Sequence, residues 1–143
     1  MTPETGRAAI QAVGDAVSEG LRKKDVAAVA AQYQPDAMIF DLAPPLAHAF
    51  DPQGLAAWLD TWEGPVDQQT RDETILVSGD LAVCYGLTKV SARTKAGGEQ
   101  AEWWQRITVC LQKIDGAWKI VHEHSSVPFH MDGSFRAAVD LQP

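Results

Sequence analysis

The sequence predicts an α+β domain in which N-terminal helices cover one face of a curved antiparallel sheet. Helical spacing and cap signals stop near residue 62, and alternating strands with short turns fill the chain after Gly64-Pro65. The strands are expected near 68–78, 81–94, 101–113 and 117–127, joined at Gly79-Asp80, Gly97-Gly98 and Asp115-Gly116. Because these connections are short, neighbouring strands should run antiparallel.

The first part of the chain carries signals for three helices and a short strand. Thr2-Pro3 and Asp51-Pro52 each place a capping residue before proline, which favours a helix start. The expected helices cover about 3–22, 26–33 and 52–62, and Pro35 ends the second. Residues 37–42 form the strand, which the following prolines interrupt because proline cannot continue a ladder.

Length and charge narrow the possible functions. The 143 residues fit a single domain, 1–143, with a core of about 5–130 and a C-terminal arm of about 131–143. The net charge of −7 argues against nucleic acid or an anionic membrane as a partner. No apolar run is long enough to span a bilayer, and the N-terminus lacks a signal-peptide pattern. Cys84 and Cys110 are expected to be reduced thiols, and the protein is expected to be cytoplasmic.

The segment from Trp103 to Pro128 predicts a β-hairpin that turns at Asp115-Gly116. In a regular register His122 and His124 share a face with Ile107, Val109 and Leu111, because side chains alternate along a strand. We therefore expect both histidines on the concave face, as hydrogen-bonding or acid-base groups of a pocket or as plain core residues. A bulge would reverse this assignment.

A metal site is not expected. The histidine pair supplies two ligands, and zinc sites usually take three or four from the protein. His48 and His130 are loop candidates only, and no third ligand has suitable spacing. We expect no metal and no other cofactor.

The opposite face of the same hairpin carries Arg106 and Glu123. They are expected to face each other diagonally, either as a cross-strand ion pair or, for Arg106, as a ligand-binding group.

Asp41 is a second candidate for chemistry, because it follows Ile39 and Phe40 in a mostly apolar strand. A carboxylate desolvated among apolar side chains is a better base at neutral pH. The alternative is a turn aspartate that binds nearby backbone amides.

The tryptophans predict apolar surfaces. Trp58 and Trp104, together with Phe40, can line a pocket for a small apolar or carbonyl-containing molecule. The adjacent Trp103 and Trp104 must point to opposite faces, which suggests an oligomer contact on the convex side.

The element order resembles the nuclear transport factor 2 and ketosteroid-isomerase-like superfamily, also called SnoaL-like, over roughly residues 5–130. The similarity is carried by Pro35-Asp36-Ala37, the run from Phe40 to Pro45, the turn at Ser78-Gly79-Asp80, the Trp104, Arg106 and Thr108 pattern, and the segment from Asp115 to Pro128. The resemblance implies a cone-shaped sheet of the cystatin-like type around one pocket, and a homodimer formed through the sheet.

The resemblance also implies a role for Asp41. In ketosteroid isomerases the catalytic base ends a strand that begins Asp-Ala, and Asp36 to Asp41 has the same spacing. Two functions remain open: an isomerase, cyclase or hydratase with Asp41, His122 and His124 as acid-base groups, or a binding or dimerisation domain without turnover.

Overall fold

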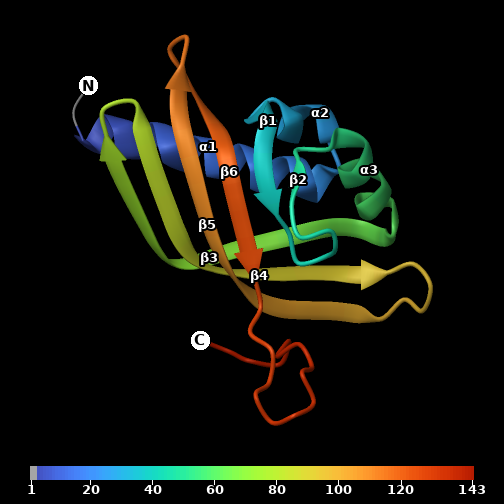
Figure 1. The fold of residues 1–143 in the computed structure, drawn as a ribbon. Helices are drawn as coiled ribbons and strands as arrows, with labels where there is room; N and C mark the ends of the chain where they lie inside the picture. Colours follow the sequence, from blue (N-terminus) through green and yellow to red (C-terminus); the bar gives the residue numbers. More distant parts are fainter. Residues whose placement is uncertain (1–2) are drawn as a thin grey trace.

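The computed structural model describes residues 3–143 and places helices against a curved six-stranded sheet (Figure 1). The helices are α1 (Pro3–Lys23), α2 (Val26–Ala30) and α3 (Pro52–Asp60). The strands are β1 (Tyr33–Phe40), β2 (His48–Ala49), β3 (Trp62–Ser78), β4 (Leu81–Thr94), β5 (Gln100–Ile114) and β6 (Ala117–Ser126). The α+β class with helices on one face of a curved sheet is confirmed. No helix within residues 3–143 is long and apolar enough to cross a membrane.

The strand order is β2-β1-β6-β5-β4-β3, and the sheet does not close into a barrel. The β3–β4, β4–β5 and β5–β6 pairs are antiparallel, as predicted, whereas β1 runs parallel to β6. The sheet is therefore mixed. In Figure 1 the strands curve in front of α1, which lies across their inner face.

Apolar packing between α1 and the sheet forms the core. Ile10, Val13 and Leu21 of α1 belong to one buried cluster with Leu111 of β5 and Ile120 of β6. The helix residues recur at the spacing of one helix face, and the strand residues lie on one face of the sheet, as the sequence pattern predicts. The core occupies part of the space under the sheet, and a pocket occupies another part.

Several element boundaries differ from the predicted ones. The second helix ends at Ala30, and Pro35 lies inside β1, where the register to β6 is interrupted between Tyr33 and Met38. A strand tolerates proline at such an irregularity, because its missing N–H is not needed there. The predicted cap Thr2 lies outside the described residues, and Asp51 makes no side-chain cap hydrogen bond.

The β5–β6 hairpin contains a bulge that reverses the predicted faces. Asp115 and Gly116 both have positive φ, and the pairs from Ile114↔Ala117 to Leu111↔Ile120 follow the regular register. The next pair is Cys110↔His122, so Val121 is an extra residue on β6. One extra residue moves every later side chain to the other face.

The chain after β6 forms a C-terminal arm of residues 127–143 that extends away from the sheet (Figure 1). A bridge between Phe129 and Ala137 holds it together, with a 2.7 Å hydrogen bond from the His130 N–H to the Arg136 carbonyl.

Candidate functional site

A small pocket lies between α1 and the inner face of the sheet, with a volume of about 100 Å³. Its apolar walls come from Ile10, Val13, Val17, Ile75, Ile107, Val109, Leu111 and Ile120. Its ionisable carboxylates are Glu73 and Glu123. A cavity of about 150 Å³ holds benzene, so this smaller pocket suits a molecule of at most about six heavy atoms and is too small for a steroid.

Glu123 reaches this pocket because the Val121 bulge turns it inward, opposite Val109. The prediction that Glu123 shares a face with Arg106 is therefore wrong. The pKa of Glu123 is raised to about 7, chiefly by burial and to a smaller extent by the negative charge of Asp41, while a hydrogen bond from Tyr33 opposes the rise. Glu123 is half-buried and borders the pocket. A carboxyl with this pKa exchanges protons readily at neutral pH.

Tyr33 fixes the position of the Glu123 carboxyl. The Tyr33 hydroxyl donates to Oε1 of Glu123 at 2.8 Å, and its ring stacks on Phe50 with 4.2 Å between centroids. Burial and then the charge of Glu123 raise the pKa of Tyr33 well above its usual value. Tyr33 therefore remains a donor throughout the neutral range, and the other carboxyl oxygen is not engaged by it.

Two threonine hydroxyls, one on β3 and one on β4, line the same pocket as Glu123. Thr70 and Thr88 line the pocket, and their hydroxyl oxygens are 3.2 Å apart. One of these hydroxyls donates its proton to the other. The hydroxyl that accepts this hydrogen bond still has its own proton, which it can donate to a bound carbonyl or hydroxyl group. Cys84 also lines the pocket, but burial raises its pKa to about 11, which keeps it a neutral thiol. Both cysteines are free, as predicted.

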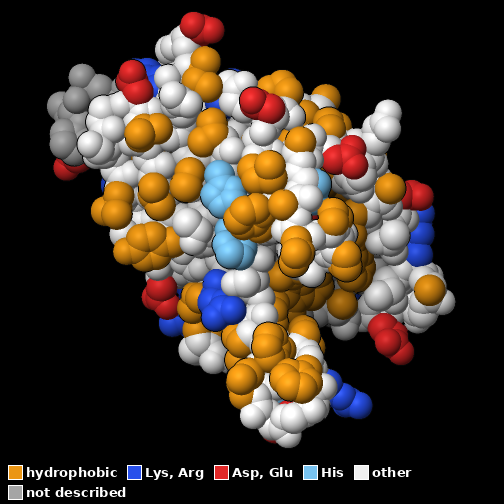
Figure 2. Space-filling model, viewed as in Figure 1, with side chains coloured by type: hydrophobic (Ala, Val, Ile, Leu, Met, Phe, Trp, Pro, Cys, Tyr) orange, Lys and Arg blue, Asp and Glu red, His pale blue; other side chains and the backbone are white. Residues whose placement is uncertain are grey.

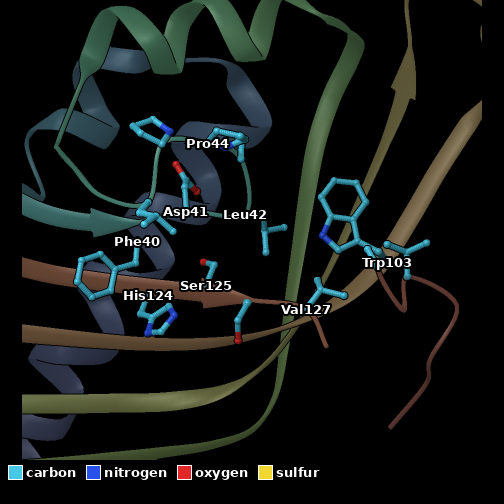
Figure 3. Close-up of a pocket in the computed structure, with 14 residues that line it drawn as sticks. Phe40, Asp41, Leu42, Pro44, Trp103, His124, Ser125 and Val127 are labelled. Atoms are coloured by element: carbon cyan, nitrogen blue, oxygen red, sulfur yellow. The ribbon is translucent and has the colours of Figure 1, made fainter. Parts of the chain in front are cut away.

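A second, more open groove of about 720 Å³ lies outside the core (Figure 3). The loop after β1, the end of β6, Trp103 of β5 and the C-terminal arm surround it. Asp41 lines this groove with a side chain that is 50% exposed, and Oδ2 lies 3.3 Å from Nε2 of His48. The expected desolvation of Asp41 is therefore wrong: β1 ends at Phe40, and Asp41 begins an exposed loop.

His122 and His124 lie on the outer face, so their predicted concave placement is wrong, and the bulge is the reason. The Phe40 ring packs edge-on to both, with centroids 4.7 Å from His122 and 5.3 Å from His124. Nδ1 of His122 lies 2.7 Å from the Met38 carbonyl, which acts as its acceptor. Figure 2 shows histidine rings at the surface among apolar side chains.

The remaining predicted ligand-binding residues are dispersed. Trp104 lies on the outer face, where Nζ of Lys89 is 6.0 Å from its ring, and Arg106 donates to the Ser126 hydroxyl at 3.0 Å. Trp58 packs on Trp62, which contacts Trp103. Trp58, Trp104 and Arg106 line neither pocket, whereas Phe40, Asp41 and His124 meet at the outer groove.

No group of three His, Cys, Asp or Glu side chains within residues 3–143 is arranged to hold a metal ion. His48 pairs with Asp41, and His130 lies 3.6 Å from Asp140 in the arm.

The fold and the inner pocket define a class: an α+β cone whose interior pocket is lined by apolar side chains and by the carboxyls of Glu73 and Glu123. A family model described as SnoaL-like domain matches residues 10–130, and the chain belongs to this family. Comparison with curated proteins gives no match.

Solved structures of similar shape support the same fold. A nuclear transport factor 2-like protein of unknown function from Pseudomonas putida is 23% identical with a TM-score of 0.86, and each chain is covered completely. A structure from Streptomyces avermitilis, described as a putative dehydratase of this family, is 14% identical over 87% of this chain and 97% of its own, with a TM-score of 0.78. One from Novosphingobium aromaticivorans, described as a putative scytalone dehydratase, is 18% identical over 94% and 91%, with a TM-score of 0.75.

Proposed function

We propose that this protein is a proton-transfer enzyme of the isomerase or hydratase-dehydratase type, with Glu123 as its general acid-base group. The observation that carries the proposal is a carboxyl with a pKa of about 7 beside an apolar pocket. Enzymes raise the pKa of carboxyl groups by burial so that they exchange protons near neutral pH. The dehydratase descriptions of two structural neighbours agree with this chemistry.

In the proposed step, ionised Glu123 removes a proton from a carbon next to a carbonyl group. The electron pair of that C–H bond moves toward the carbonyl oxygen, and Glu123 becomes neutral. A threonine hydroxyl, Thr70 or Thr88, donates to that oxygen. Glu123 then returns the proton to another carbon, which isomerises the molecule, or to a departing hydroxyl group, which dehydrates it.

Hydrogen exchange into a small ketone tests this function without knowledge of the natural substrate. Cyclopentanone in D₂O should lose its α-protons faster with the protein than with buffer, as followed by proton NMR. Glu123→Gln should reduce the protein-dependent rate by a factor of 10² or more, which general acid-base catalysis typically supplies. The matched control is Glu102→Gln, an exposed carboxyl that bonds Ser91; exchange that survives Glu123→Gln contradicts the proposal.

The predicted catalytic role of Asp41, His122 and His124 stays a hypothesis, and of these residues Asp41 and His124 line the outer groove. The same exchange assay separates the two sites. If Asp41→Asn abolishes exchange while Glu123→Gln keeps it, the reaction belongs to the groove.

A binding domain without turnover is the second candidate. It is favoured by the small volume of the inner pocket, about 100 Å³, and by Trp62 and Trp103, which pack against the core. Ligand binding with no exchange in any variant supports this alternative.

We also propose a homodimer through the outer face of the sheet. Leu76 on this face is 56% exposed and Met38 is 43% exposed, and strand pairing places both in one row across the sheet through Val83, Cys110 and His122. Trp104 lies further along β5 on the same face. Such exposed apolar surface favours protein contact. Sedimentation at micromolar concentration should give a dimer that Leu76→Arg dissociates; a monomeric wild type contradicts this arrangement.

A further inference from the structure

The inner pocket opens to solvent between α1 and β3. On α1, Gln11, Gly14 and Ser18 line the pocket at spacings of three and four residues, which places them on one side of the helix. Gln68, Thr70 and Glu73 of β3 also line it. Gln11, Gly14 and Glu73 are exposed, so these residues form the mouth, whereas Ile10 and Val13 lie deeper.

Gly14 leaves this mouth open. A Cβ placed there would meet no atom within 4 Å, whereas a Cβ at Gly20 of the same helix would lie 2.6 Å from Val29 Cγ2. Close packing therefore accounts for Gly20 and does not account for Gly14. A glycine inside a helix costs about 1 kcal/mol relative to alanine, so Gly14 weakens α1 while it keeps a gap at the pocket mouth.

The charge of the pocket has one sign. Among the residues that line it, all within the described chain, Glu73 and Glu123 are acidic and none is Lys, Arg or His. The nearby cation is Arg7, whose Nη1 lies 3.5 Å from the Ile75 carbonyl and which is not part of the lining. A bound carboxylate or phosphate would thus face two carboxylates without a cation in contact.

We propose that the pocket selects small ring compounds that are neutral or cationic and excludes anions, with Gly14 as the residue that sets the permitted size. The ring lies on the apolar floor, and its substituent leaves through the gap at Gly14. This inference rests on the site of the proposed function and names the class of substrate that the site accepts.

Three ring compounds with the same number of heavy atoms and different charge test the selectivity: cyclopentanone, cyclopentylamine and cyclopropanecarboxylate. Titration at pH 8, followed by amide chemical shifts in NMR, should show binding of the ketone and the amine at the pocket. The carboxylate should bind at least tenfold more weakly, and Glu73→Gln should narrow that difference. Equal binding of the carboxylate, or binding of none of the three, overturns the proposal.

Gly14→Leu tests the size rule, and Ala12→Leu is its matched control, since Ala12 is an exposed α1 residue outside the pocket lining. Gly14→Leu raises helix propensity, and Ala12→Leu lowers it only slightly because leucine ranks just below alanine. Both variants should therefore fold, with melting temperatures close to or above that of the wild type. Gly14→Leu should weaken the binding of ketone and amine at least tenfold, and Ala12→Leu should not. Unchanged binding in folded Gly14→Leu overturns the role of Gly14. Selective ketone binding without hydrogen exchange would reject the proposed reaction and leave this inference intact.

Discussion

Two carboxylates with opposite surroundings distinguish the inner pocket from the outer groove. Glu123 lies on a buried strand face, and its carboxyl has a pKa of about 7. Asp41 lies at the start of a loop, half-exposed and paired with His48. The comparison shows that apolar neighbours in the sequence do not by themselves remove a carboxylate from water. Whether it is desolvated depends on which sheet face the side chain points to and on whether the residue lies within the strand or beyond its end.

The two regions are not independent. The charge of Asp41 contributes to the raised pKa of both Glu123 and Tyr33. The charge in the outer groove therefore influences the inner carboxyl, and removal of the Asp41 charge should change the pKa of Glu123.

The largest expected effect is on the pH dependence of stability. Glu123 keeps its proton to about pH 7 in the folded state, whereas its ordinary pKa is 4.5. Because the folded state binds more protons between these values, wild-type stability should fall as the pH rises through this range. Between pH 5.5 and 8.5 the loss is about 2 kcal/mol at 1.36 kcal/mol per pH unit.

Urea unfolding of Glu123→Gln at pH 5.5 and 8.5 measures this effect. The amide does not titrate and still offers an oxygen to the Tyr33 hydroxyl, so the variant should lose this part of the pH dependence. Glu102→Gln should retain it. A wild type whose stability does not fall across this interval would place Glu123 in contact with bulk water and break the contrast with Asp41.

A smaller effect is expected from Tyr33→Phe. The variant keeps the ring against Phe50 and removes the donor to Glu123, so the pKa of Glu123 should rise further. The stability cost at pH 8.5 should be about 1.5 kcal/mol, the lower end of the range for a hydrogen bond to a charged group. Carbon-13 NMR of the glutamate carboxyl measures the pKa. In the Glu123→Gln background the cost should shrink, and an equal cost in both backgrounds would mean that the bond carries no coupling energy.

The sequence contains enough information for the fold but not for the face of every side chain. Asp115-Gly116 predicts the hairpin because both residues adopt positive φ, and the register follows correctly as far as Ile120. Val121 is an ordinary strand residue, and nothing in its type marks it as a bulge. Strand side chains alternate with a period of two, so one extra residue reverses the faces that follow it. Glu123 and Ser125 therefore point to the inner face, and His122 and His124 point to the outer face.

Asp41 illustrates a different limit of prediction. Its spacing from Asp36 resembles that of a known base position, and it does line a groove. However, exposure at the end of β1 depends on how the loop to β2 and the C-terminal arm are placed. The loop and arm residues that line the groove together are about 80 to 100 positions apart in the chain, and local patterns do not encode their placement.

The smallest expected effect comes from Asp41→Asn. Its ion pair with His48 is exposed, and such pairs contribute less than about 1 kcal/mol. The pKa of His48 is raised mainly by its hydrogen bond to the Ala49 carbonyl and secondarily by Asp41, so the variant should lower that pKa only slightly. Any stability from this pair is present below the ordinary pKa of His48 and lost as the pH rises through the raised value.

In Asp41→Asn the pKa of Glu123 should also fall, because a negative charge is removed. NMR titration of both groups in one sample checks these shifts. A larger shift at Glu123 than that caused by Tyr33→Phe would show that the outer groove, rather than the hydrogen bond within the cone, governs the inner carboxyl.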